Sequence, residues 1–275
     1  MLAAKRWVIG SVVLLLIGMA WSPVSQSVGL QQSQAGLERA LATFAIARGL
    51  NAVISMVQGT ELAFEPMGIG AVFAIGQVLD PINDLVEQFS SLMLLASVAF
   101  GLQILLIKIG AHWLLSVSLT VVAIAYAVMA AWRGGSPGWL VRLFLVLALA
   151  RFAVPVCALV SEGVYQVFLQ QEYVAAWSSL ERSKDEIRAS ERQVSDESAS
   201  AGSKPSWPKI PDVKKIAKDI MQAAEKSVQH MIDLMVVFLL QTVVVPLVFL
   251  WVIVAAGRSV VSPKGVRHGN GTSPA

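Results

Sequence analysis

Five stretches of the chain are almost purely apolar, and polar segments separate them. They cover residues 7–21, 89–107, 113–132, 140–160 and 234–256. A helix of about 20 apolar residues, rising 1.5 Å per residue, crosses a hydrocarbon core about 30 Å thick. Because backbone groups in lipid must hydrogen-bond within their own segment, each stretch is predicted to be a membrane-spanning helix. Tryptophan, a common interfacial anchor, recurs near the ends of these stretches, at Trp7, Trp21, Trp113, Trp132 and Trp139.

The composition supports a membrane protein rather than a soluble domain. Of the 275 residues, 56% are hydrophobic and 14% charged, and the mean hydropathy is +0.66. Ordinary soluble domains carry about 25% charged residues, so a soluble fold of this composition would expose much apolar surface to water. We therefore expect an all-α polytopic membrane protein with about five transmembrane helices, located in the inner (cytoplasmic) membrane of a bacterium.

Charge and motif content argue against several classes of function. The 21 Lys+Arg against 18 Asp+Glu are too evenly balanced to indicate a nucleic-acid binder. The single cysteine, Cys157, excludes an internal disulfide and suits a small buried packing residue. With only three histidines, no Cys/His zinc site has its ligands. Nucleotide-binding glycine loops, HExxH helices and GxSxG turns are absent from the sequence, so we expect no enzyme, no metal and no cofactor.

The first apolar stretch, within residues 1–21, fits two interpretations. Lys5 and Arg6 precede it, and Gly18-Met19-Ala20 suits the small-residue cleavage site of a secretory signal peptide. An uncleaved signal anchor explains the same residues, because Trp21-Ser22-Pro23 also suits a chain that leaves the membrane. In either case the two basic residues hold the N-terminus in the cytoplasm and direct the following segment outward.

Residues 22–87 are expected to form an extramembrane, periplasmic segment, because they contain six acidic and only two basic residues. Segments poor in basic residues are the ones most easily exported. Their spacing predicts an amphipathic helix softened near Gly49. A possible β-hairpin follows, because residues 60–65 alternate in polarity and Pro66-Met67-Gly68 indicates a turn before a second strand at 69–75. The hairpin would need a membrane, helix or partner against which to pack.

A helix that continues into the second span is predicted to begin at Asp80-Pro81, an N-cap acid followed by proline at the first helical position. Asp80, Asp84 and Glu87 share one face of that helix. Three carboxylates could form a weak cation site. Acidic residues in the first turns more commonly offset the helix dipole, and we favour that interpretation.

Residues 88–160 are predicted to form a three-helix membrane unit, whose last two helices are antiparallel neighbours because the turn at 133–138 is short. Arg151 stands in the middle of the last span, where a charge costs a few kcal/mol unless it faces protein or water. Its candidate partners are Gln103, Gln241 and, if the last helix enters deeply, Asp233. We favour a structural role that joins helices over a role in lining an anion or substrate path.

His230 and Asp233 are spaced i, i+3 at the start of the last span, residues 234–257. Such a pair could carry protons or hold a metal. Two ligands make a poor metal site, however, and histidine is common at a membrane interface, so we give this reading little weight.

Residues 161–233 are predicted to form an antiparallel helical hairpin continuous with the two neighbouring spans. Apolar residues recur at heptad spacing on both sides of a Pro/Gly/Ser-rich linker at 195–211. They form a candidate interaction seam at Tyr173, Trp177, Leu180, Ile187, Ile216 and Ile220. Polar Lys184, Glu191 and His230 interrupt the seam, so two solvated helices that do not pair remain an alternative. These three polar residues would also leave a lone hairpin only marginally stable, so we expect a second copy or another protein to complete the seam.

These features predict a non-enzymatic assembly, scaffold or partner-binding component of the membrane. Its partners would be the lipid bilayer and either a second copy, in a homo-oligomer, or another membrane protein, with no nucleic acid. The alternative is a channel or transporter subunit that uses Arg151 in a polar path.

Five crossings from a cytoplasmic N-terminus place residues 22–87 outside, the hairpin inside and the tail, residues 258–275, outside. Arg258, Lys264 and Arg267 favour a tail on the inside instead. The two signals disagree, and we keep the five-span count.

Overall fold

The structure, a computed structural model, describes residues 2–64, 73–133, 137–200 and 213–261. They form α1 (Leu2–Trp21), α2 (Val24–Phe64), α3 (Phe73–Gly110), α4 (Trp113–Arg133), α5 (Gly138–Val164), α6 (Gln170–Ser200), α7 (Val213–Leu239) and α8 (Val245–Val261). Two short π-helical segments, η2 (Tyr165–Leu169) and η3 (Leu240–Val244), join α5 to α6 and α7 to α8. No strand occurs in the described ranges, and the predicted all-α class is confirmed.

The number of helices able to span a membrane also agrees with the prediction. Among the described residues, four segments are long and apolar enough to cross a bilayer: Asp80–Gly110, Trp113–Ala130, Gly138–Glu186 and Glu225–Arg258. A fifth would combine α1 with α2, which meet at an angle of 61°. The long apolar stretches therefore fold as helices, as their length and composition require.

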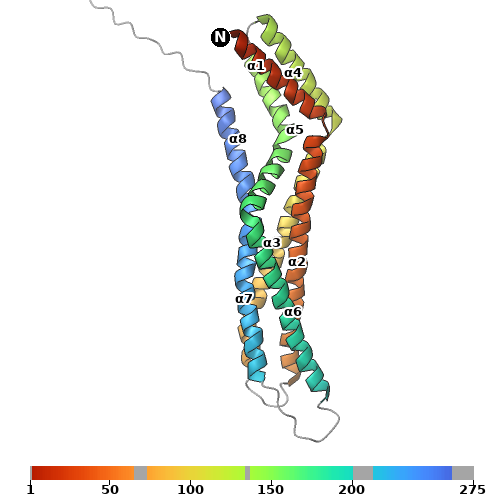
Figure 1. Ribbon diagram of the computed structural model, residues 1–275, viewed down its shortest axis with the longest axis vertical. Helices are drawn as coiled ribbons and strands as arrows, with labels where there is room; N and C mark the ends of the chain where they lie inside the picture. Colours follow the sequence, from red (N-terminus) through yellow and green to blue (C-terminus); the bar gives the residue numbers. More distant parts are fainter. Residues whose placement is uncertain (1, 65–72, 134–136, 201–212, 262–275) are drawn as a thin grey trace, which may run out of the picture.

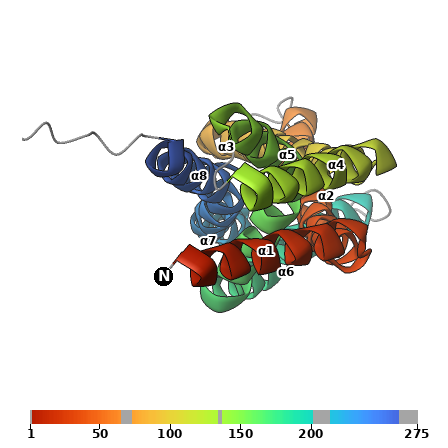
Figure 2. The ribbon, with the colours of Figure 1, turned by 90° about the horizontal axis from the view of Figure 1, so that it is seen from above.

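The helices build an elongated bundle. Figure 1 shows α2, α3, the continuous α5–α6 run and the continuous α7–α8 run extending along its length. The shorter helices α1 and α4 lie across one end, which is plain in the view from above (Figure 2). At the opposite end, α2 and α6 terminate beside the first residues of α3 and α7.

A continuous apolar core fills the space between α2, α3, α6 and α7. Each of the four helices supplies side chains that are fully buried, among them Leu50, Ile54, Val86, Phe89, Leu180, Met231 and Leu234. Within each helix these residues recur three or four positions apart, which gathers them on one face. Burying one such side chain contributes about 1.5 to 3 kcal/mol, so this core is the main source of stability for the bundle.

Large apolar side chains cover the outside of several helices. On α3 they begin at Leu94 and continue to Ile109, and similar residues cover the exposed faces of α4, α5 and α8. A soluble protein would not expose so many. They mark the part of the molecule that faces lipid.

The predicted β-hairpin is wrong over its described residues. Helix α2 continues to Phe64 and α3 begins at Phe73, so residues 60–64 of the first expected strand and 73–75 of the second are helical. Residues 65–72 lie outside the described ranges. Glutamate, leucine and alanine in 60–64 favour a helix, and α2 packs against α3, so tertiary contacts support the helix over a weak alternation.

The predicted start of the α3 helix at Asp80 is also wrong. The helix begins seven residues earlier, and Pro81 lies inside it. Similarly, α6 continues to Ser200 through the first part of the expected linker. The rest of that linker, 201–211, lies outside the described residues. Composition therefore misplaced both helix boundaries, which are the least certain part of such a prediction.

The structure changes how the seam of α6 and α7 is completed. The two helices lie side by side, and Tyr173 and Leu180 are buried, but they are buried in the core shared with α2 and α3. Trp177 packs against the same core, whereas the side chains of Ile187, Ile216 and Ile220 lie outside the description. The chain's own α2 and α3 thus fill the described part of the seam that we expected a partner to complete.

The expected placement of residues 22–87 and 161–233 on opposite sides of the membrane is also incompatible with the structure. Helices α2 and α6 pack together: a Cβ added to Gly49 would lie 3.1 Å from Cδ of Lys184. Two segments separated by a bilayer could not touch. The charge count of a long segment was a weak guide to its side.

Candidate functional site

Arg151 occupies a buried position where four helices meet. Its side chain extends from α5, and the residue is 3% exposed. Nη1 donates to the carbonyl of Gly110 at 2.7 Å, and Nη2 donates to the carbonyl of Ala20 at 2.8 Å. With the amide oxygen of Gln26 turned toward the guanidinium, that oxygen accepts from Nη1 at 2.7 Å and also from Nη2. One side chain therefore joins α1, α2 and α3 to α5.

The partners of Arg151 are explained by helix ends. The last four carbonyls of a helix lack partners within it, and the C-terminus carries partial negative charge. Ala20 lies in the last turn of α1 and Gly110 is the last residue of α3, so both present such carbonyls to the cation. The planar guanidinium presents a separate nitrogen to each carbonyl in a fixed geometry, whereas a lysine would have to serve both from one nitrogen.

Further polar contacts fix the end of α1 next to α4. Ser116 Oγ donates to the same Ala20 carbonyl at 3.2 Å, and Trp21 Nε1 donates to Thr120 Oγ1 at 3.1 Å. Helix α1 is therefore bound to α4 and α5 through its last two residues, at the place where a signal peptidase would cut.

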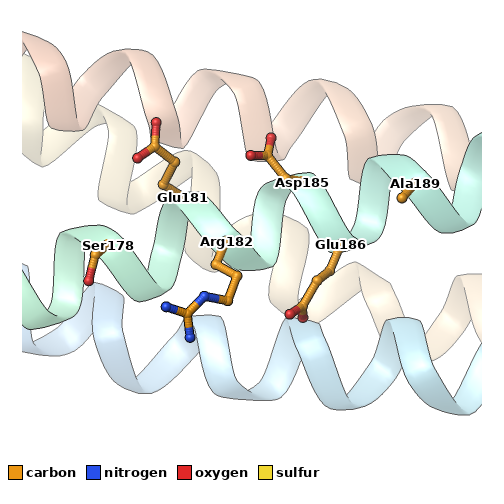
Figure 3. Close-up of a pocket in the computed structure, with 6 residues that line it drawn as sticks. All are labelled: Ser178, Glu181, Arg182, Asp185, Glu186 and Ala189. Carbon is orange, nitrogen blue, oxygen red and sulfur yellow. The ribbon is translucent and has the colours of Figure 1, made fainter.

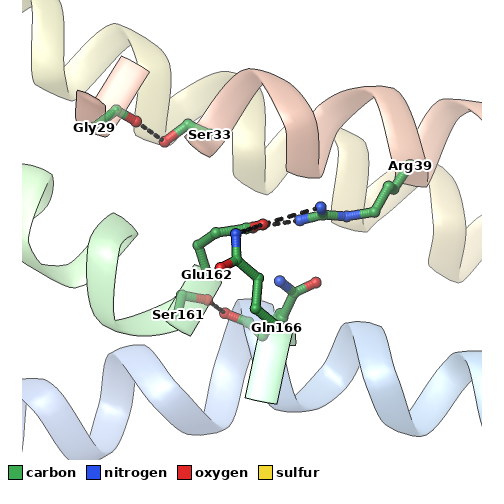
Figure 4. Close-up of polar contacts among 7 residues, drawn as sticks. Gly29, Ser33, Arg39, Ser161, Glu162 and Gln166 are labelled. Atoms are coloured by element: carbon green, nitrogen blue, oxygen red, sulfur yellow. Dashed lines mark hydrogen bonds and ion pairs between the residues drawn. The ribbon is translucent and has the colours of Figure 1, made fainter. Parts of the chain in front are cut away.

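A second buried polar centre lies further along α5, about three helical turns after Arg151. Arg39 on α2 forms a bidentate ion pair with Glu162, with Nη1 to Oε1 at 3.2 Å and Nη2 to Oε2 at 2.5 Å (Figure 4). The two side chains are 17% and 8% exposed. Gln166 donates to Oε1 of the same carboxylate at 3.2 Å. Paired charges with added hydrogen bonds are the form in which buried charges are tolerated.

Aromatic rings enclose this ion pair. The guanidinium carbon of Arg39 lies 3.8 Å from the centre of the Tyr165 ring, a cation–π contact. Tyr173 packs edge-on against Tyr165, with ring centres 5.9 Å apart, and its hydroxyl lies 3.5 Å from Thr43 Oγ1. The rings keep water from much of the pair, which strengthens its electrostatic attraction.

Both centres lie next to irregular parts of the long helices. Pro155 has no N–H, so the carbonyl of Arg151 has no partner one turn ahead. Gly29 lets α2 approach there, because an added Cβ would lie 3.1 Å from Cα of Pro155. The π-helical segment η2 begins at Tyr165, less than one turn after Glu162, and Ser161 Oγ donates to the carbonyl of Gln241, in η3, at 3.0 Å. π-Helical turns are frequent at functional sites.

The structure separates the other residues that the sequence singled out. Gln103 and Gln241 were expected beside Arg151, but the guanidinium bonds to carbonyls and to Gln26 instead. The side chain of Gln241 is buried, and its Oε1 has no hydrogen-bond partner among the described residues. Nδ1 of His230 lies 3.8 Å from Oδ2 of Asp233 on the half-exposed surface of α7. Asp233 thus pairs with its own helix neighbour and not with Arg151.

No group of three or more side chains able to hold a metal occurs in the described ranges. Those ranges include the pair on α7 and the three acids of α3, Asp80, Asp84 and Glu87. Cys157 is buried, in keeping with a packing role.

One surface hollow of about 440 Å³ lies on α6. Figure 3 shows its six lining residues, all from this helix: Ser178, Glu181, Arg182, Asp185, Glu186 and Ala189. It is open, with acidic and basic groups mixed, and therefore suits a protein surface better than a small-molecule site.

The Arg39–Glu162 pair escaped the sequence analysis. Arg39 was counted only as part of an extramembrane charge balance, and Glu162 only as the start of the hairpin. A usable signal was present: Glu162 comes two residues after a long apolar stretch and precedes the segment 164–169, which is apolar except for Gln166. An acid so placed needs a cation, and Arg39 is one of the two basic residues in 22–87.

Searches of the sequence against family models and curated proteins, and of the structure against solved structures, gave no match. The geometry of the two polar centres is therefore the guide to function. That geometry joins helices: carbonyls, an amide and a carboxylate surround two arginines.

Proposed function

We propose that the protein is a non-enzymatic membrane scaffold that holds a partner protein at a fixed distance from the bilayer. Its stalk, defined as residues 41–64, 73–93, 170–200 and 213–233, is the part of the bundle distal to the Arg39–Glu162 pair. The observation that carries the proposal is the continuity of stalk and spans, since α5 passes through η2 into α6 and α7 passes through η3 into α8. A partner bound to the stalk would therefore be held rigidly relative to the membrane.

The two polar centres support this role. Each joins α5 to α2 in the buried part of the molecule, so the bundle resists sliding of one helix along another. At 1.5 Å per residue, the 31 residues of α6 extend about 46 Å. A rigid, membrane-anchored rod of this length suits a spacer or an assembly platform.

The alternative, a channel or transporter subunit, would place Arg151 along a polar path. Its guanidinium is instead enclosed by backbone carbonyls and Gln26. This supports the joining role. Flux measurements on the full chain reconstituted in liposomes test the alternative: solute flux that Arg151→Leu abolishes without unfolding the protein would replace the scaffold proposal.

The surface of the stalk that we propose for partner binding is the charged hollow on α6. Its lining carries the acids Glu181, Asp185 and Glu186 and the base Arg182. Charged surfaces of this kind select partners by charge complementarity more than by apolar burial. The partner would be a protein with a complementary pattern of charges. In a bacterial cell we place the scaffold in the inner membrane, since outer-membrane proteins span as β-barrels.

Site-specific photo-crosslinking in native membranes tests the proposal on the full chain. A photoreactive residue replaces Ser178 or Ala189, which are small and exposed at the hollow, and Leu159, exposed on the apolar face of α5, serves as the control position. We expect the same protein to be captured at both hollow positions and not at Leu159.

A charge exchange sharpens this test. Arg182→Glu combined with Glu186→Arg keeps the net charge and the i, i+4 spacing, so helix stability should change little, whereas the complementary partner should be lost. Capture that persists unchanged in the exchanged variant, or no protein captured at either hollow position, would reject the proposed surface.

A further inference from the structure

Helix α2 exposes polar side chains beside helices that expose apolar ones. Between residues 30 and 40 its exposed positions are Gln31, Gln34 and Glu38. They are spaced i, i+3 and i+7, so they form one stripe along a single helix face. We call this set the α2 polar stripe.

Two close contacts fix the height of the stripe in the bundle. A Cβ added to Gly36 would lie 2.7 Å from Cδ1 of Phe100, and one added to Gly29 would lie 3.6 Å from Cδ1 of Ile107. The stripe therefore lies beside the 100–107 part of α3. The exposed side chains of α3 there are leucines, including Leu102 and Leu105.

The same height on α5 is also apolar outside. Gly29 approaches Pro155, and Arg39 reaches Glu162, so the stripe lies beside residues 155–162. Exposed residues there are Val156, Leu159 and Val160. The stripe is thus at the level of the faces that contact lipid, although sequence analysis assigned all of α2 to an extramembrane segment.

Polar side chains at this level cannot be left facing acyl chains, because they would lose hydrogen bonds that lipid does not replace. Glutamine and glutamate in membranes accordingly face protein or water. Within the chain, the inner face of α2 is already packed against α3 and α5. Something outside the described chain must cover the stripe.

We propose that a second copy of this chain covers it, so that the α2 helices of two copies pack together through their polar stripes. The stripe is complementary to itself: each glutamine amide both donates and accepts, and the extra N–H groups can serve the carboxylate of Glu38. A two-fold axis brings identical stripes together. Exposed Leu41, Ala42 and Ala45 continue along this side of α2, and the two alanines let two helices approach closely.

The inference goes beyond the proposed scaffold function, because it assigns a membrane-level contact between copies and makes no use of the stalk surface. Self-association was first expected at the α6–α7 seam, where α2 and α3 pack instead. The α2 polar stripe now takes the place of that seam as the expected contact between copies. A different membrane protein bound at the stripe is an outcome that the following test distinguishes.

Cysteine crosslinking of the full chain in native membranes tests the contact. In a Cys157→Ala background, Gln34→Cys places a thiol in the stripe, and Leu102→Cys places one at the same height on the lipid face of α3. We expect a crosslinked species of twice the chain mass from Gln34→Cys and none from Leu102→Cys. Equal crosslinking at both positions, or a product containing another protein at position 34, would overturn the proposal.

A second measurement does not depend on crosslinking. The dissociation constant between labelled copies is obtained by energy transfer as the protein is diluted in liposomes. Gln31→Leu with Gln34→Leu should weaken association by about five- to tenfold, the effect of losing two interhelical hydrogen bonds. Leu102→Gln with Leu105→Gln is the reverse control and should not strengthen the same contact. A chain that stays monomeric at every dilution would reject the second copy.

Discussion

Arg151 and Glu162 project from the same face of α5, three helical turns apart, and both bond to α2. Arg151 bonds to Gln26 and Glu162 to Arg39. Eleven residues correspond to almost a whole number of turns at 3.6 residues per turn, so one helix face carries both contacts. Between them, Gly29 allows α2 to lie directly against Pro155. The height of α2 relative to the apolar faces is thereby set by α5.

The first prediction concerns the joining role of Arg151. Arg151→Leu should insert normally but lower the free energy of unfolding by roughly 1 to 3 kcal/mol, because several interhelical hydrogen bonds are lost. Arg151→Lys should have a free energy of unfolding between those of the native protein and Arg151→Leu, since an ammonium cannot reach two carbonyls in the same geometry. Thermal unfolding of the full chain in detergent measures this. Arg142→Leu, on the exposed part of the same helix, is the control and should change stability little.

The second prediction concerns the Arg39–Glu162 pair. Glu162→Gln leaves a buried guanidinium without its counter-charge and should destabilise the protein by roughly 3 kcal/mol. Replacing both, as Arg39→Met with Glu162→Leu, should restore much of that loss, because no unpaired charge remains. The same thermal measurements, arranged as a double-mutant cycle, give the coupling energy. Glu172→Gln, at an exposed position of α6, should have little effect; an equal loss there would mean that the pair is not special.

The third prediction tests the close contact of α2 with α3. Gly36→Ala places a methyl group against the ring of Phe100 and should destabilise by roughly 1 to 3 kcal/mol. Gly101→Ala, where an added Cβ meets nothing within 4 Å, should be neutral or slightly stabilising. Pairing Gly36→Ala with Phe100→Leu should recover part of the loss. If the two alanine variants behave alike, the helices do not approach as closely as the structure shows.

The sequence predicted the elements of the fold better than their contacts. Long apolar stretches identify helices because the bilayer leaves the backbone few alternatives, and this gave the all-α class and the helices long enough to span a membrane. The predicted strand at 60–65 was wrong because alternation over six residues is a weak signal compared with the packing of α2 along α3. The partners of α6 and α7 could not be derived either, since a heptad seam shows that a face is buried but not which helices bury it.

For the two polar centres, what could be predicted from the sequence depended on whether the bonding partner was a side chain or a backbone group. Arg151 was identifiable because a charge in the middle of an apolar stretch is conspicuous. Its actual partners, the carbonyls of Ala20 and Gly110, were not, because a backbone group at a helix end has no signature in side-chain identity. Glu162 and Arg39 are 123 positions apart, and only the fold brings them together.

The fourth prediction is that α1 is retained as a signal anchor. Cleavage after Ala20 would remove the helix whose last carbonyls hold Arg151 and Ser116. Mass spectrometry of the protein from native membranes should therefore find α1 peptides attached to the chain. Deleting residues 2–20 should lower thermal stability at least as much as Arg151→Leu does. A mature protein that starts at Trp21 with unchanged stability would contradict this role of α1.

The last prediction places two segments on the same side of the membrane. Arg48 on α2 and Arg182 on α6 are both exposed on helices that pack together. In a Cys157→Ala background, single cysteines at these positions should react with a membrane-impermeant thiol reagent from the same side. Trp132→Cys is the reference: the residue is exposed on α4, the helix that lies at the other end of the bundle (Figure 1), and its labelling pattern should differ. Because contact between α2 and α6 requires a shared compartment, labelling of the two arginine positions from opposite sides would contradict the packing of the bundle. It would restore the arrangement that charge counting alone had favoured.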